Sequence, residues 1–420
     1  MTPRTKKLIW LVCILSACVY LALALRGQKI FGTIALLFLT GAWLATRDKR
    51  QEDGALSQGM RWLAWAGLVA TIIGDTCLVT LNARIGEMTF IVGVAGFATA
   101  QSLWILALGI GRPIPWRSIV GWSIALCTFV NVRLLPVLPP SLAFAIFIYA
   151  LTTSLLQSVC WRSRSIAWIA GCTLLLVSDV LIAYSSMLGA PKTDRWIGPL
   201  YILSLIAFAF GICTDFRLPK IRIDIRAALG ASMALLFFII GGYCASTPSA
   251  WYNPLRQMLS YLGRSRIGDV LYPPCHYWFM AGMFASTAIT TSVFHEIAQR
   301  TSNRIAAFFI DWGGMLNATG LAVIALVPEN VKMNVHNYGC DMAVVGGFFA
   351  VITLTCQRRS HWIWFVLFSL TTAIFIAFLY AIARKILPFS PYLPTAQKAL
   401  ILLFMGWLMR ICIREAQSKS

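Results

Sequence analysis

Long apolar runs alternate along the chain with short polar segments that contain basic residues, Pro or Gly. Each apolar run is about 20 residues long, the length of helix that crosses the hydrocarbon core of a bilayer. The pattern predicts about fourteen membrane helices, centred near Leu15, Leu37, Val69, Gly96, Cys127, Ile148, Leu175, Leu205, Phe237, Phe284, Leu316, Val345, Thr372 and Leu403. We therefore expect an all-α protein, a polytopic transmembrane helical bundle.

Composition and charge agree with this interpretation. The chain is 59% hydrophobic and only 12% charged, whereas soluble domains are about 25% charged. With a cytoplasmic N-terminus, about 22 of the 35 Lys and Arg residues lie on the cytoplasmic side, so the positive-inside rule favours both termini in the cytoplasm. The net charge of +20 favours anionic lipid headgroups as partners, and the scattered basic residues argue against nucleic acid. We expect a multi-pass protein of the bacterial inner membrane.

A charge-rich stretch divides the chain. Residues 215–226 predict a basic cytoplasmic linker between an eight-helix domain, residues 1–214, and a six-helix domain, residues 227–420. Within the first domain, the segments Gly67–Asp75 and Gly171–Asp179 share one outline, in which a small residue and an apolar run precede a second small residue and Asp. The first domain is therefore interpreted as two parallel four-helix repeats.

Asp75 and Asp179 lie deep inside apolar helices. A charge near the middle of a bilayer costs roughly 2.5 to 3.5 kcal/mol, so such residues usually face a polar cavity, an ion path or an active site. The duplication places both carboxyls at similar depth, and we expect them to face one cavity. Helical periodicity puts Thr71 and Asn82 on the face of Asp75, and Ser186 on that of Asp179.

The first half resembles the YhhN family of lysoplasmalogenases, eight-helix integral membrane hydrolases, over roughly residues 8–215. The residues that carry the resemblance are Gly74, Asp75 and Leu78, Phe90 to Phe97 with Ala100, Gln101 and Trp104, Pro139, Tyr149, Ser178, Asp179, Leu181 and Ala183. The sequence departs from the family at Gln101, where His is usual, and at Tyr201, where a Tyr-Tyr-x-x-Gln segment is usual.

The resemblance implies cleavage of the vinyl ether of a lysoplasmalogen or related lysolipid, which yields a fatty aldehyde and a glycerophospho-alcohol without a cofactor. Asp75 and Asp179 would be the catalytic acid and base, because burial and a neighbouring carboxyl favour the protonated form of one of them. Sequence does not assign the two roles. The candidate substrate-binding residues, taken from the resemblance and from shared helix faces, are Thr71, Asn82, Gln101, Tyr149, Ser178 and Tyr201.

Other functions remain open. The aspartates could be the titratable site of a lipid or ion transporter, or protonated groups that pack helices together. A third alternative is a non-catalytic protein that binds or senses lipid. The six-helix domain could dock lipid or stabilise a homodimer.

The second half has weaker similarity to uncharacterised six-helix membrane domains of the Frag1 type. Cys275, His276, His336 and Cys340 are candidate zinc ligands by residue type, but a disulfide between the cysteines or plain packing is favoured over a metal. Residues 251–268 have apolar positions at helical spacing and predict an interfacial helix. Glu329, beside Pro328, is expected to be a solvated loop group.

Overall fold

The computed structural model describes residues 29–46, 56–81, 87–190, 194–214, 222–246, 252–357, 362–383 and 393–417. These residues form thirteen α-helices and almost no sheet, which confirms the predicted helical bundle. Nine candidate membrane spans occur in these ranges. The helix predicted near Leu15 lies outside them, and the cytoplasmic placement of both termini stays a prediction.

The chain forms two compact units, Met1–Pro219 and Lys220–Ser420. The division falls inside the predicted linker, of which residues 215–221 lie outside the described part of the chain. The first helix of the second unit begins at Ile223, so the end of the expected linker is helical.

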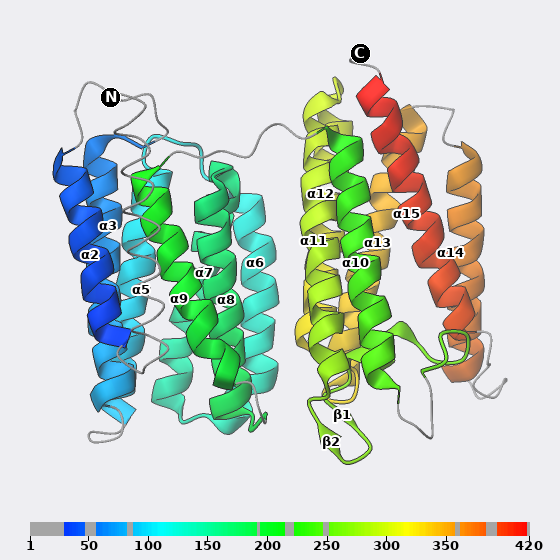
Figure 1. Ribbon diagram of the computed structural model, residues 1–420. Helices are drawn as coiled ribbons and strands as arrows, with labels where there is room; N and C mark the ends of the chain where they lie inside the picture. Colours follow the sequence, from blue (N-terminus) through cyan, green and yellow to red (C-terminus); the bar gives the residue numbers. More distant parts are fainter. Residues whose placement is uncertain are drawn as a thin grey trace. The chain divides into compact units, whose positions relative to one another are not determined.

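The first unit is a bundle whose helices run roughly along a common direction (Figure 1). Its elements are α2 (Lys29–Thr46), α3 (Gln58–Asp75), the π-helical turn η1 (Thr76–Leu81), α5 (Glu87–Gly109), α6 (Trp116–Phe129), the π-helical turn η2 (Val130–Leu134), the 3-10 turn η3 (Leu135–Val137), α7 (Pro140–Ser163), α8 (Ile166–Ile182), the π-helical turn η4 (Ala183–Met187) and α9 (Asp194–Cys213).

The two halves of this unit pack in the same way. A Cβ on Gly67 of α3 would collide with the indole of Trp104 in α5, and a Cβ on Gly171 of α8 would collide with the ring of Phe208 in α9. Each residue of the second pair lies 104 positions after its counterpart, Gly171 after Gly67 and Phe208 after Trp104. Contacts between α5 and α7 are matched by contacts between α9 and α2. The structure thus has the internal repeat that the Gly-to-Asp segments indicate.

The second unit consists of α10 (Ile223–Ala245), the 3-10 turn η5 (Leu259–Gly263), the strands β1 (Arg266–Ile267) and β2 (Val270–Leu271), α11 (Pro274–Arg300), α12 (Arg304–Leu326), α13 (Met333–Gln357), α14 (Trp362–Ala383) and α15 (Leu393–Gln417). Its helices again run along one another, and the β1–β2 hairpin lies at one end of them (Figure 1). Ile289, Phe294 and Trp407 belong to its buried apolar core.

The predicted interfacial helix over residues 251–268 is wrong. The described part of this segment has turns, η5 and the short antiparallel hairpin, in which Arg266 pairs with Leu271. Asn253 accepts hydrogen bonds from the backbone N–H groups of Leu255 and Arg256, which is a turn geometry. Side chains that stabilise turns therefore override the helical spacing of the apolar residues.

Gly313 lets the backbones of α12 and α13 touch. An added Cβ would lie 2.7 Å from the carbonyl oxygen of Gly346 and 3.0 Å from the backbone N of Ala350, so a whole helix would have to move. We expect Gly313→Ala to lower the free energy of unfolding by about 1 to 3 kcal/mol, as overpacked cores do. Thermal unfolding in detergent measures this. Gly59→Ala is the control, since nothing lies within 4 Å of its added Cβ; equal stability of the two variants would contradict the close contact.

Candidate functional site

The two aspartates occupy equivalent positions in the two repeats. Asp75 is the last residue of α3, and Asp179, 104 positions later, lies near the end of α8. Each helix continues into a π-helical turn, η1 after Asp75 and η4 four residues after Asp179. Such turns are rare inside helices and occur frequently at functional sites, because they redirect the side chains around them.

Asp75 and Asp179 line one cavity of about 210 Å³. Asp75 is only 5% exposed, and Asp179 is partly accessible. Most of the wall is apolar, formed by Leu78, Phe90, Val94, Phe97, Leu126, Phe129, Val130, Leu134, Ile146, Ala150, Leu176, Val180, Ile182, Ala183, Met187 and Ile197. Its polar side chains include Thr153, Ser178 and two tyrosines. The cavity thus combines two carboxyl groups with walls suited to an alkyl chain.

Each carboxyl accepts a hydrogen bond from a tyrosine on another helix. The hydroxyl of Tyr201 in α9 donates to Oδ2 of Asp75 at 2.8 Å, and that of Tyr149 in α7 donates to Oδ2 of Asp179, also at 2.8 Å. These bonds fix the position of each carboxyl inside the cavity. Both tyrosines line the cavity themselves, so they would also touch a bound molecule.

Close packing sets the position of Tyr201. Gly74 leaves room for the ring of Phe97, which a Cβ on Gly74 would approach to 2.6 Å. Phe97 in turn contacts the ring of Tyr201 edge to face, with centroids 5.8 Å apart. A small residue before Asp75 therefore allows the edge-to-face contact that places the Tyr201 phenol at the carboxyl.

The other predicted substrate-binding residues differ in whether they line the cavity. Ser178 lines the cavity, and its hydroxyl donates to the carbonyl of Ile197. Gln101 does not line the cavity. Its side chain is fully buried, and its Oε1 accepts hydrogen bonds from the hydroxyls of Thr152 and Thr153. Thr71 is fully buried, and its hydroxyl donates to the carbonyl of Leu68 in its own helix. Asn82 lies outside the described residues.

Thr153 is a cavity residue that the sequence analysis did not identify. It lies four positions after Tyr149 in α7, the spacing at which two side chains share a helix face, and that spacing could have indicated it. Its hydroxyl bonds with Gln101 and with the backbone carbonyl of Tyr149. Gln101 therefore connects to the site through Thr153.

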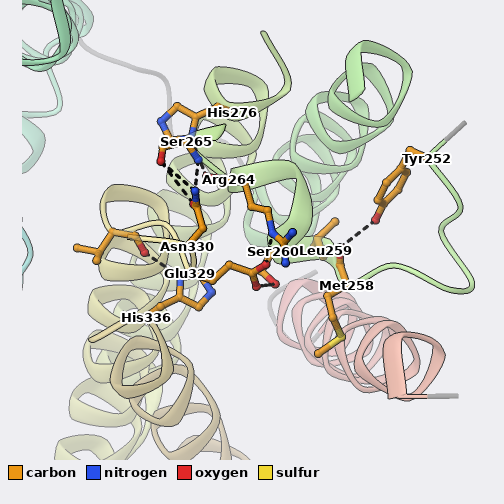
Figure 2. A network of polar contacts seen from close by, with 12 residues as sticks. Tyr252, Met258, Leu259, Ser260, Arg264, Ser265, His276, Glu329, Asn330 and His336 are labelled. Carbon is orange, nitrogen blue, oxygen red and sulfur yellow. Dashed lines mark hydrogen bonds and ion pairs between the residues drawn. The ribbon is translucent and has the colours of Figure 1, made fainter. Parts of the chain in front are cut away.

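The four candidate zinc ligands of the second unit do not form a common site. His276 and His336 lie on separate elements (Figure 2). Nδ1 of His276 lies 2.7 Å from the backbone carbonyl oxygen of Gly263, and Nδ1 of His336 lies 2.8 Å from that of Val327. Cys275 and Cys340 are free thiols that pack in the same apolar cluster, so the disulfide alternative is wrong. Among the described residues, no three His, Cys, Asp or Glu side chains are grouped as metal ligands.

Glu329 is not a solvated loop group. Its carboxylate accepts hydrogen bonds from Ser260 and from Arg264, both at 2.6 Å, and Asn330 beside it bonds to Ser265 (Figure 2). Only 11% of the Glu329 side chain is exposed. This network attaches the segment between α12 and α13 to the turn before β1, and we assign it a structural role.

Comparison with known proteins gives one match. Residues 27–212 match the YhhN family. The matched range covers the first unit from α2 to the last turn of α9. No curated protein and no solved structure is similar enough to match the chain. The match agrees with the resemblance seen in the sequence and does not extend to the second unit.

Proposed function

We propose that the first unit is a membrane hydrolase of the lysoplasmalogenase type, which cleaves the vinyl ether of a single-chain ether lipid. The observation that carries the proposal is the pair of carboxyls, Asp75 and Asp179, in one largely apolar cavity. The family match over residues 27–212 supports it. Apolar walls suit the alkenyl chain, and the two carboxyls suit acid and base work on the ether.

Vinyl ethers are cleaved by protonation on carbon. One aspartic acid gives its proton to the carbon β to the ether oxygen, and the adjacent carbon becomes an oxocarbenium ion. The other carboxylate stabilises this cation and takes a proton from the attacking water, the division of roles found in two-carboxylate glycosidases. The first carboxyl, now ionised, takes the hydroxyl proton of the resulting hemiacetal, and the second, now protonated, gives its proton to the glycerol oxygen as the carbon–oxygen bond breaks, which returns both groups to their starting states. The net reaction consumes one water and gives an aldehyde and an alcohol.

The surrounding residues supply positioning. Tyr149 and Tyr201 orient the carboxyls through their 2.8 Å hydrogen bonds. The apolar wall limits the access of bulk water, which strengthens the electrostatic interaction between a carboxylate and the developing cation. A membrane-embedded cavity of this kind would take its substrate from the lipid phase.

Turnover of matched lipids tests the proposal. The purified protein is expected to release fatty aldehyde from a 1-alkenyl lysophospholipid and to leave the 1-acyl ester and the saturated 1-alkyl ether intact, because only the vinyl ether forms an oxocarbenium ion on protonation. A coupled aldehyde dehydrogenase assay measures the product. Absence of aldehyde would contradict the proposal, and lipid flux into proteoliposomes without chemical change would favour the transporter alternative.

A further inference from the structure

A buried amide lies behind one of the two pairs of carboxyl and tyrosine. Gln101 of α5 is fully buried and contacts two threonines of α7. Its Oε1 accepts a hydrogen bond from Thr152 at 2.8 Å, and its Nε2 donates to the hydroxyl of Thr153 at 3.1 Å. The phenol of Tyr149 is also in side-chain hydrogen-bond contact with Gln101 and with Thr153. The mechanism above gives this amide no role.

The donors and acceptors of these groups set the direction of the hydrogen bonds. An amide nitrogen only donates, whereas a phenol oxygen has a single proton and can also accept. With the amide of Gln101 beside it, the Tyr149 oxygen accepts, and its one proton is directed to Oδ2 of Asp179 at 2.8 Å. A reversed bond, in which a protonated Asp179 donates to the phenol, would turn the phenol proton towards the amide N–H groups. The chain of donors therefore suits a carboxylate at Asp179.

Helix packing alone does not require this amide. The position equivalent to Gln101 in the second repeat, 104 residues later, is Leu205, which is also fully buried. The repeat fold thus accommodates an apolar side chain at this place. A buried amide costs free energy unless its hydrogen bonds are made, so its presence in one repeat indicates a task specific to that side of the cavity.

We propose that Gln101 is a positioning residue, which holds the phenol of Tyr149 as a donor to Asp179 and so gives Asp179 the role of the carboxylate. The inference rests on the proposed function for the reaction, but the chain of hydrogen bonds is testable without turnover. The other titratable side chains of the described cavity wall are Asp75 and Tyr201, so the role of the acid falls to Asp75. Asp179 would then stabilise the oxocarbenium ion and take a proton from the attacking water.

Gln101→Met tests the inference, because it removes the amide at nearly constant size. Thr152 and Thr153 each keep a hydrogen bond to the backbone carbonyl of Tyr149, both at 2.9 Å, so the variant is expected to fold. We expect kcat for the 1-alkenyl lysophospholipid to fall about ten-fold at unchanged KM, as for one lost hydrogen bond that stabilises a charge. The acidic limb of the kcat–pH profile should move up by about one pH unit, because the base must be ionised, and the alkaline limb should not move.

Gln157→Met is the matched control. Gln157 of α7 is also buried, but its Nε2 donates to the carbonyl of Cys172 and it does not contribute to the described cavity wall, so the wild-type profile is expected. In a Tyr149→Phe background, Gln101→Met should cause no further loss of kcat, because the amide acts through the phenol. An additive loss, an unmoved acidic limb or a moved alkaline limb would each overturn the inference. If the Met variant does not fold, Gln101→Asn decides in the same way, because its shorter side chain withdraws the amide from the phenol.

Infrared difference spectroscopy separates this inference from the hydrolase proposal. The C=O stretch of protonated Asp179 is followed against pH in the full-length protein, and Asp179→Asn identifies the band. Gln101→Met should move the midpoint of this band up by about one pH unit, and Gln157→Met should not move it. A shift in a protein that releases no aldehyde would refute the hydrolase proposal and leave the positioning of Asp179 standing. An unshifted band would overturn the inference, whether or not aldehyde is released.

Discussion

Asp75→Asn and Asp179→Asn are each expected to abolish aldehyde release. Both carboxyls line one cavity, and the proposed reaction needs one as acid and the other as base. Asn has nearly the shape of Asp but neither donates a proton to carbon nor carries a negative charge. General acid–base catalysis contributes about 10²- to 10⁴-fold, so each variant should lose at least about a hundred-fold in kcat.

The measurement is single-substrate turnover with the 1-alkenyl lysophospholipid, together with thermal unfolding of each variant. Asp269→Asn is the control, because Asp269 is exposed in the β1–β2 hairpin of the second unit. It should keep full activity. A folded Asp75→Asn or Asp179→Asn protein with near-normal turnover would remove the two-carboxyl mechanism.

Hydrophobic runs alone predict most of this fold. In lipid, a helix satisfies its backbone hydrogen bonds within its own segment. An apolar stretch of membrane length therefore predicts a helix without knowledge of the rest of the chain. Residues 252–272 are an exception to this prediction, because their turns depend on side chains such as Asn253 and on packing against other segments. A helical spacing of apolar residues does not distinguish a short interfacial helix from such a folded loop.

The site is only partly visible in the sequence. Asp75 and Asp179 stand out because a carboxyl in an apolar helix is costly wherever the rest of the chain lies. Helical periodicity is less successful at predicting which other residues face the cavity. Ser186, expected on the face of Asp179, is exposed, because the π-helical turn η4 intervenes and changes the number of residues per turn. Thr71 shares a helix face with Asp75 yet points into the helix packing.

The partners of the carboxyls depend on contacts between helices. Tyr201 is 126 residues from Asp75 in sequence, and Tyr149 is 30 residues from Asp179. No spacing rule connects such residues. The internal repeat does not predict these bonds either, since the counterpart of Tyr201, 104 residues earlier, is Phe97. The two repeats have thus diverged at the cavity, and only one of these two equivalent rings bears a hydroxyl.

Tyr201→Phe and Tyr149→Phe are each expected to lower kcat by about 10- to 100-fold, with little change in KM. Each substitution removes one hydroxyl that donates to a carboxyl at 2.8 Å, and a hydrogen bond to a charged group contributes about 1.5 to 3 kcal/mol. The loss falls on kcat because the carboxyl must be positioned most accurately when charge develops. Tyr201→Phe should fold normally, since Phe97 already fills the equivalent place in the other repeat.

Steady-state kinetics of the two single variants and of the double variant test this prediction. The two tyrosines act on different carboxyls, so their effects on log kcat should be roughly additive if each carboxyl has its own role. Tyr243→Phe, which alters an exposed ring of the second unit, is the control and should leave kcat unchanged. Wild-type kcat in both single variants would show that the phenols do not position the carboxyls. A double variant no slower than either single one would mean that the two carboxyls titrate and act as one unit, since disturbing either would then already disturb both.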